Sequence, residues 1–126
     1  MDTIRRVGVA GCGLMGSGIA EVLARAALDV VVCEVDAAAV DAGRARIEQS
    51  MGHGVFSGKL TELARDSALA RLTFTTDLID LAECELVIEA VSESEDLKLE
   101  VMRTLDKVVA APEAILASNT STISIR

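Results

Sequence analysis

Aromatic residues are nearly absent from this chain of 126 residues, which has no Trp, no Tyr and only two Phe, Phe56 and Phe74. Proteins that bind single-stranded nucleic acids stack the bases on aromatic side chains, so this class of ligand is disfavoured. The formal net charge of −8 also disfavours contact with a phosphate backbone. We therefore expect no nucleic-acid partner, and an anionic ligand has to be held by local dipoles and a few cations.

Long apolar runs are lacking as well, since none approaches the ~18 residues that indicate a membrane-spanning helix. The first residues lead directly into a short apolar run, so we expect neither a signal peptide nor a membrane partner. The three cysteines, Cys12, Cys33 and Cys84, are odd in number and follow no CxxC spacing. This pattern predicts reduced, buried thiols in a cytoplasmic protein and no metal site.

The most informative motif lies in Val7–Ala20, with the sequence VGVAGCGLMGSGIA. A short apolar strand is followed by Gly11, Gly13 and Gly16 at the spacing GxGxxG. Apolar residues then recur at helical intervals: Ile19, Val22, Leu23 and Ala26. Gly11 permits a tight turn, Gly13 lets the backbone approach a phosphate, and Gly16 lets the helix pack closely on the strand. This context favours a dinucleotide-binding loop over an ordinary strand-to-helix turn, because the helix N-terminus then faces the pyrophosphate.

A carboxylate is expected about 20 residues after such a loop, at the end of the next strand. A β-branched run that ends at Val32 leads through one cysteine into Glu34, 23 positions after Gly11. A carboxylate there accepts hydrogen bonds from ribose hydroxyls and repels a 2′-phosphate, which favours NAD over NADP as the cofactor. Asp36 is the competing candidate, but we interpret it as the N-cap of the helix that follows.

Strands and helices alternate along the rest of the sequence, which predicts an α/β fold of the Rossmann type, a doubly wound parallel sheet in one domain, residues 1–126. The expected strands are Leu72–Thr75, Glu85–Val91 and Ala114–Ala117, and the expected helices are Ala37–Met51, Lys59–Leu72 and Glu95–Val109. The glycines at positions 52, 54 and 58 are expected to end the first of these helices. His53, the only histidine, is then an exposed turn residue.

Ligands of parallel sheets bind at the carboxyl ends of the strands. This rule predicts that the glycine loop, Glu34, Val91–Glu93 and Ser118–Ser121 meet at one edge of the sheet. For Ser118–Ser121 the alternative is a simple polar turn, in which Ser and Asn side chains bond their own backbone.

Five segments of the sequence form a recognisable set. They are Val7–Ala20, Ser57–Leu60 (SGKL), Thr76–Leu78 (TDL), Leu86–Val91 (LVIEAV) and Ile115–Ser121 (ILASNTS). Together they resemble the NAD-binding domain of the 3-hydroxyacyl-CoA dehydrogenases, in particular the bacterial 3-hydroxybutyryl-CoA dehydrogenases. IEAV followed at a distance by ASNTS is far more specific than a glycine loop alone. The resemblance implies an oxidoreductase of fatty acid metabolism that transfers a hydride between NAD and the 3-hydroxyl of an (S)-3-hydroxyacyl-CoA.

The resemblance also implies roles for single residues. Those that contact the cofactor are Gly11, Cys12, Gly13, Leu14, Met15, Gly16, Glu34, Glu93, Lys98, Asn119 and Ser121. Those that contact the CoA substrate are Ser50, Lys59 and Ser121, and Ser121, beside the 3-oxygen, is the catalytic residue of this chain. Glu34 departs from the Asp that is usual in the family. Ser57 stands where the family has a CoA-binding lysine, and Lys59 is the nearest substitute. Glu93 with Lys98 can also be a surface pair at a helix start, and Ser50 a helix-end residue.

Two parts of the family pattern are missing from these 126 residues. The family's general base is a His paired with a Glu, on a strand soon after the SNTS loop, and His53 lies too far upstream to replace it. The helical C-terminal domain, which closes over the acyl-CoA and forms the homodimer, is missing too. We therefore expect a fragment of a longer dehydrogenase that is inactive alone. The alternatives are an NAD-dependent dehydrogenase of a non-CoA hydroxy acid and a non-catalytic NAD-binding module.

Overall fold

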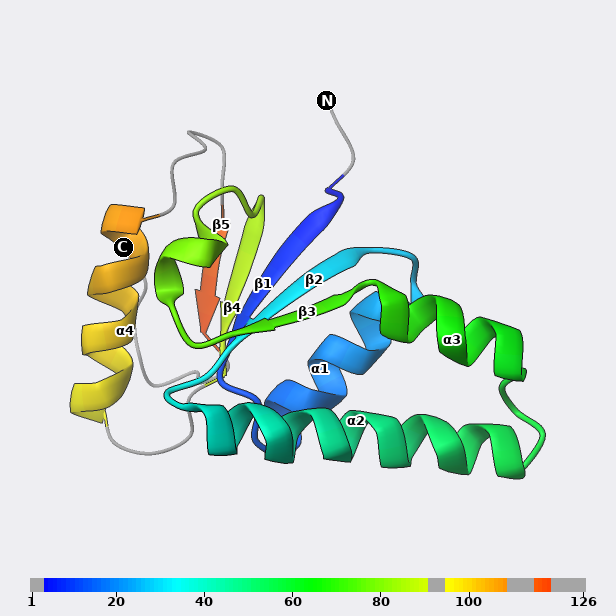
Figure 1. Cartoon of the computed structure of the whole chain (residues 1–126). Coiled ribbons are helices and arrows are strands. Elements are labelled where there is room, and N and C mark those ends of the chain that lie inside the picture. The colour runs from blue at the N-terminus through cyan, green and yellow to red at the C-terminus, as the bar shows by residue number, and fades with distance from the viewer. Residues whose placement is uncertain (1–3, 91–94, 109–114, 119–126) are drawn as a thin grey trace.

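The protein was analysed as a computed structural model, which describes residues 4–90, 95–108 and 115–118. Over these residues it has one five-stranded parallel sheet in the order β3-β2-β1-β4-β5 (Figure 1). The strands are β1 (Arg6–Ala10), β2 (Asp29–Cys33), β3 (Leu72–Thr75), β4 (Leu86–Glu89) and β5 (Ile115–Ser118). The helices are α1 (Leu14–Arg25), α2 (Ala37–Phe56), α3 (Glu62–Ala70), the short 3-10 helix η1 (Leu78–Leu81) and α4 (Glu95–Val108). The predicted doubly wound Rossmann-type fold is confirmed.

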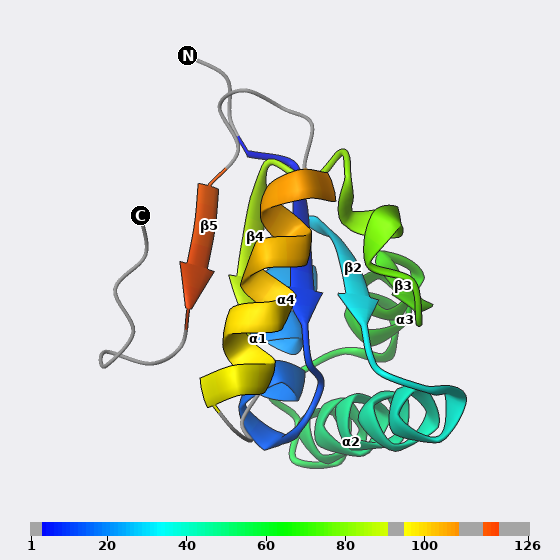
Figure 2. The same ribbon diagram turned by 90° about the vertical axis from the view of Figure 1, so that its left-hand side faces the viewer.

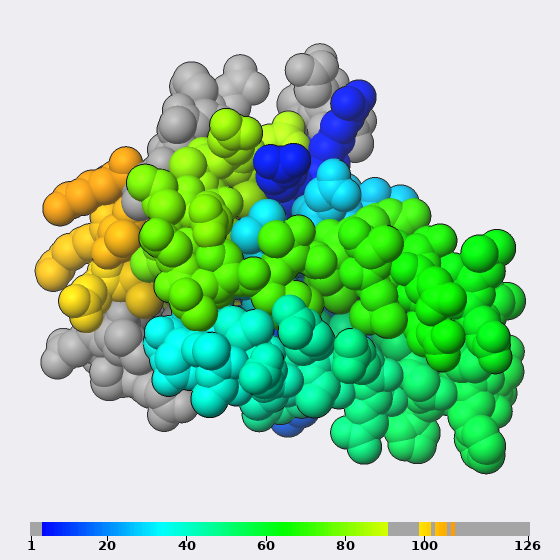
Figure 3. Space-filling view, viewed as in Figure 1, coloured from blue at the N-terminus to red at the C-terminus, as the bar shows by residue number. Residues whose placement is uncertain are grey.

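Helices cover both faces of the sheet, with α4 on one face and α1 on the other (Figure 2). Successive strand residues point to opposite faces, and Val7–Ala10 of β1 are all buried, so the sheet is covered on both faces. Val9 packs with α1, α2 and α3, whereas its neighbour Ala10 packs with Leu81 of η1 and Leu105 of α4. α2 and α3 lie side by side at the surface (Figure 3). The three cysteines are free and buried, as predicted. Of the helices that the structure describes, none combines the length and apolar character needed to cross a bilayer.

The buried face of α1 coincides only in part with the apolar stripe that the sequence pattern indicates, since Ile19 and Leu23 are partly buried against the core. Val22 belongs to that stripe but is 65% exposed. The buried residues of the helix are Gly16, Ser17, Ala20, Glu21 and Ala24. A Cβ on Gly16 would lie 2.1 Å from the backbone oxygen of Gly11, so the helix approaches the strand end at this glycine. This close approach selects small residues at four-residue intervals for the inner face.

Helix α2 is longer than predicted. Its start is as expected, because the Asp36 carboxylate accepts from the backbone N–H of Ala39 at 2.8 Å. The expected end at Met51 is wrong, since the helix continues to Phe56 through two glycines. Met51 is fully buried, and glycine costs only about 1 kcal/mol in a helix interior, so packing outweighs propensity. Gly58, with φ +80°, follows the true end, and His53 lies on the helix rather than in a turn.

Helix α3 is shorter than the predicted Lys59–Leu72. It begins at Glu62, after Thr61, whose hydroxyl accepts from the backbone N–H of Ala64 at 3.0 Å. Leu63 on this helix is 78% exposed although its side chain is apolar. A short capped helix thus replaces one long amphipathic helix, because the N-cap hydroxyl favours a start at this point. The bounds of β4 differ from the predicted ones by one or two residues, and Val109 and Ala114, the predicted end of the last helix and start of the last strand, lie outside the described residues.

Two glycines of α2 provide a test of this packing. A Cβ on Gly43 would lie 2.6 Å from Sγ of Cys12, whereas a Cβ on Gly52 would meet no atom within 4 Å. We expect Gly43→Ala to lower the free energy of unfolding by roughly 1–3 kcal/mol through overpacking. Gly52→Ala should raise it by about 0.5–1 kcal/mol, since alanine is the better helix former. Urea unfolding followed by circular dichroism measures both, and equal effects of the two substitutions would contradict the contact.

Candidate functional site

The carboxyl ends of the strands lie together at one edge of the sheet. Ala10 at the end of β1 is in register with Cys33 of β2 on one side and with Glu89 of β4 on the other. Glu89 is in turn in register with Ser118 of β5. The strand order reverses beside β1, with β2 and β3 on one side of it and β4 and β5 on the other. Parallel sheets bind their ligands at such a switch point. The glycine loop is therefore at the expected place.

Each glycine of the loop has the geometry that its predicted role requires. Gly11 has φ +103°, a conformation that favours glycine, and its N–H donates to the carbonyl of Cys33 at 2.8 Å. Gly16 makes the close approach to Gly11 described above. A Cβ on Gly13 would meet no atom within 4 Å, so the space in front of it is open. Gly13 is also the N-cap of α1 and has no side chain to cap the first turn. An anion can therefore approach the N-terminus of α1.

Glu34 follows β2 directly and its carboxylate lies against the glycine loop. One oxygen, Oε2, accepts from the backbone N–H of Cys12, and Oε1 accepts from the N–H of Val35 at 3.1 Å. A carboxylate offers about four lone-pair sites, so two bonds to the backbone leave acceptors for the hydroxyls of a ribose. The structure thus brings Glu34 and the loop together as predicted.

The peptide of Cys12 is held from several sides, and two of its partners were not predicted. Its carbonyl accepts from Oγ of Ser17 at 3.0 Å and from Nη1 of Arg46 at 3.0 Å. Its Sγ lies 3.3 Å from the same Ser17 hydroxyl. Burial raises the pKa of the Cys12 thiol, so the group stays protonated at neutral pH and serves packing. No pattern in the sequence indicated this contact of Arg46, because an arginine on the polar side of a helix is ordinary.

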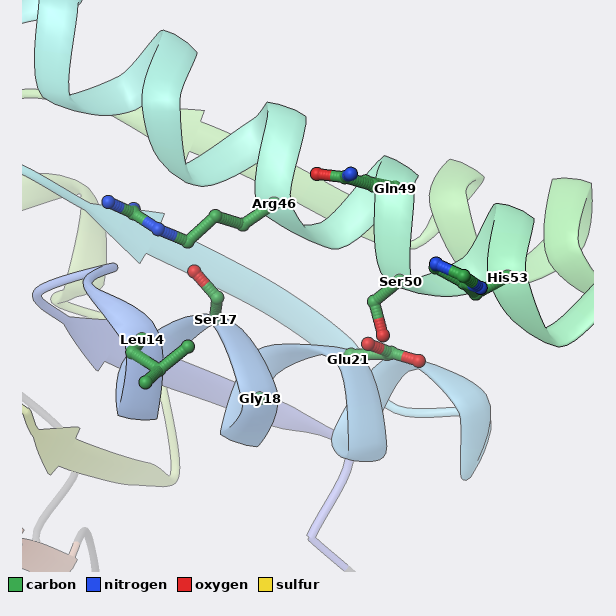
Figure 4. Close-up of a pocket in the computed structure, with 8 residues that line it drawn as sticks. All are labelled: Leu14, Ser17, Gly18, Glu21, Arg46, Gln49, Ser50 and His53. Atoms are coloured by element: carbon green, nitrogen blue, oxygen red, sulfur yellow. The ribbon is translucent and has the colours of Figure 1, made fainter.

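A cleft of about 390 Å³ lies between α1 and α2, which we call the α1–α2 cleft (Figure 4). It is lined by Leu14, Ser17, Gly18 and Glu21 of α1 and by Arg46, Gln49, Ser50 and His53 of α2. Ser50 was predicted as a substrate contact, and its side chain points toward α1. His53, expected as an ordinary turn residue, also lines the cleft. Lys59 is exposed beyond the end of α2 and is not among the lining residues.

The other predicted site residues are described incompletely or not at all. Glu93, Asn119 and Ser121 lie outside the described residues. Lys98 belongs to the backbone of α4, but its side chain lies outside the description. Among the described residues, Glu89 is a fully buried carboxylate at the end of β4, and the sequence analysis gave it no role.

Substitution of two glycines of α1 tests whether the loop binds a dinucleotide. In Gly16→Ala the new Cβ overlaps the backbone oxygen of Gly11, which no side-chain rotation relieves. We expect this variant to lose at least about 10-fold in affinity for NADH, because the helix N-terminus moves from the pyrophosphate site. Gly18→Ala is the matched control, since its Cβ meets no atom within 4 Å. Fluorescence titration with NADH measures both, and equal affinities in the two variants would count against the loop assignment.

Comparison with known proteins supports the interpretation of the glycine loop as part of an NAD-binding domain. Residues 6–126 match the family model described as "3-hydroxyacyl-CoA dehydrogenase, NAD binding domain". A 3-hydroxybutyryl-CoA dehydrogenase of Mycobacterium tuberculosis is 57% identical over 124 residues, which cover 98% of this chain and 43% of that protein. The chain therefore spans less than half the length of this relative.

Solved structures give the same result. The crystal structure of M. tuberculosis FadB2 matches with a TM-score of 0.95 at 57% identity, covering 98% of this chain and 44% of that one. An (S)-3-hydroxybutyryl-CoA dehydrogenase, PaaH1 from Ralstonia eutropha, matches with a TM-score of 0.91 at 42% identity, covering 98% and 43%. The predicted cofactor, NAD, is the one that the family description names. The glycine loop, the neighbouring carboxylate and these matches lead to one conclusion: this chain belongs to the family of NAD-binding domains of 3-hydroxyacyl-CoA dehydrogenases.

Proposed function

We propose that this chain is the cofactor-binding part of a dehydrogenase that oxidises the 3-hydroxyl of an (S)-3-hydroxyacyl-CoA, with 3-hydroxybutyryl-CoA as the model substrate. The observation that carries the proposal is the Glu34 carboxylate beside the glycine loop in a chain of this family. Residues 1–126 form one NAD-binding domain, and we infer that it belongs to a longer chain because it covers 43% of its M. tuberculosis relative. That longer chain is proposed to be a cytoplasmic homodimer.

The described residues fit NAD on structural grounds. The open space at Gly13 admits a pyrophosphate to the N-terminus of α1, where the helix dipole favours negative charge. Glu34 retains lone pairs for ribose hydroxyls. A second negative charge in the same place, the 2′-phosphate of NADP, would be repelled by this carboxylate. When bound, NAD supplies the hydride acceptor of the reaction.

The remaining predicted site residues are proposed to contact the substrate or the nicotinamide side of the cofactor. We propose that the Ser121 hydroxyl bonds the 3-oxygen, because a hydroxyl both donates and accepts and therefore suits an oxygen that alternates between alcohol and ketone. Ser121 follows β5 by three residues, and β5 ends at the edge where the glycine loop lies. Glu93, Lys98 and Asn119 are proposed on the nicotinamide side, and Ser50 and Lys59 at the CoA. These roles rest on the family motif.

We propose that the general base comes from outside these residues, as the family motif implies. His53 is the only histidine of the sequence, and it lines the α1–α2 cleft near the far end of α2, away from the strand ends (Figures 1 and 4). General acid–base catalysis typically contributes ~10²–10⁴-fold to the rate. The 126 residues alone are therefore proposed to bind NADH without turning over the substrate.

Cofactor preference tests the role of Glu34. We expect the unmutated chain to prefer NADH over NADPH. Glu34→Ala should weaken NADH binding by about 10- to 150-fold and narrow the gap to NADPH, since charge-assisted hydrogen bonds contribute roughly 1.5–3 kcal/mol. Asp36→Ser is the matched control, because it removes a carboxylate two positions away and keeps an N-cap side chain. Calorimetry measures all three chains, and equal affinity of the unmutated chain for both cofactors would exclude this role.

Catalysis by the full-length dehydrogenase tests the role of Ser121. If the hydroxyl serves the 3-oxygen, Ser121→Ala should lower kcat by on the order of 10²–10³-fold, as expected for one hydrogen bond of an oxyanion-type site. The melting temperature should stay nearly unchanged. A variant that melts several degrees lower and keeps its kcat would identify the serine as a turn residue instead. NADH titration of the same variant provides the control for cofactor binding.

A further inference from the structure

We propose that Arg46 is a positioning residue for the cofactor. Together with Ser17 it fixes the peptide between Cys12 and Gly13, so that the N–H of Gly13, and not the carbonyl of Cys12, faces the pyrophosphate of NAD. This inference rests on NAD as the cofactor and does not depend on the identity of the substrate. It assigns a role to Arg46 and Ser17, which have none in the proposed reaction.

The Cys12 carbonyl has both of its acceptor sites in use. Oγ of Ser17 donates to it from α1 and Nη1 of Arg46 donates to it from α2, each at 3.0 Å. A carbonyl oxygen offers two lone pairs, so these two donors satisfy it. The bond from the guanidinium is charge-assisted and is therefore the stronger of the two. The carbonyl is thus directed toward the two helices.

The direction of this carbonyl determines the direction of the next N–H. A peptide bond is planar and trans, so the N–H of Gly13 points opposite to the Cys12 carbonyl. The carbonyl of Gly13 is directed along α1 as well, because it accepts from the N–H of Ser17 at 2.9 Å. A Cβ on Gly13 would meet no atom within 4 Å, so the space beside this residue is open. An anion at the N-terminus of α1 would therefore meet a donor.

Loss of both bonds to the carbonyl would permit this peptide to reverse. Rotation about the two torsions that flank a peptide turns it over, and Gly13 has no Cβ to oppose the rotation. A reversed peptide would present the partial negative charge of the Cys12 oxygen to the pyrophosphate. The Glu34 carboxylate, which accepts from the N–H of Cys12, already adds negative charge nearby. The direction of one peptide therefore has a large effect on the affinity for an anion.

A close approach of α2 to the loop brings Arg46 within reach of the carbonyl. A Cβ on Gly43 would lie 2.6 Å from Sγ of Cys12 and 3.1 Å from its carbonyl oxygen. Arg46 follows Gly43 by three positions, so the two residues lie on one face of the helix. Arg46 itself is exposed, whereas Cys12 is fully buried. The arginine thus contributes a bond to the loop and little packing to the core.

Titration with NADH tests the inference. Arg46→Met removes the donors and keeps an unbranched side chain, and Ser17→Ala removes a donor without changing the charge. We expect each to weaken NADH binding by about 3- to 10-fold, the range of one hydrogen bond. Because either bond alone opposes the reversal, the double variant should lose more than the product of the two single losses. Arg44→Met is the matched control, since Arg44 lies on the same helix, 4.7 Å over the Phe74 ring, and should keep NADH affinity.

Two further measurements separate positioning from a general loss of structure or charge. Arg46→Lys keeps the charge and a donor and should recover most of the NADH affinity. Adenosine, which lacks the pyrophosphate, should bind Arg46→Met and the unmutated chain equally. Equal NADH affinity in Arg46→Met and Arg44→Met, independent losses in the double variant, or an equal loss for adenosine would overturn the inference and leave NAD binding intact. Absence of NADH binding by the unmutated chain would overturn the proposed function itself.

Discussion

The close contact between Gly16 and the backbone of Gly11 is the constraint on which the rest of the structure depends. A Cβ at position 16 would lie 2.1 Å from the Gly11 oxygen, so only glycine allows α1 to begin directly at the end of β1. This contact places the helix N-terminus at the switch point of the sheet. It also decides which residues of α1 are buried, because the helix then packs through Ala20 and Ala24.

The peptide of Cys12 extends this constraint to the neighbouring elements. Its N–H donates to Glu34 after β2, and its carbonyl accepts from Ser17 of α1 and from Arg46 of α2. The conformation of the loop is thus fixed by bonds to three other parts of the fold, which reduces the entropy lost on binding. The same arrangement orders Arg46 at the α1–α2 cleft. The positive charge of Arg46 acts locally, because the chain has a net charge of −8 and its overall field repels anions.

Much of the site could be predicted because its signals are local in sequence. The glycine spacing specifies a turn that few other residues allow. Glu34 directly follows β2, whose β-branched run is a clear strand pattern. Arg46 and Ser17 could not be found in this way, because their role depends on a carbonyl that the fold brings to them. The position of His53 was missed for a related reason. The burial of Met51 carries α2 past glycines that end helices when propensity alone decides.

The sequence by itself determined the alternation of strands and helices, the parallel sheet and the dinucleotide loop, since each follows from periodicity or from the absence of a Cβ. Tertiary structure alone decided which face of α1 is buried, where α2 ends and which side chains of α1 and α2 enclose a cleft. These features depend on contacts between residues far apart in the chain, such as Gly43 against Cys12. Local patterns carry no information on such contacts, because the energy of packing is a property of both partners.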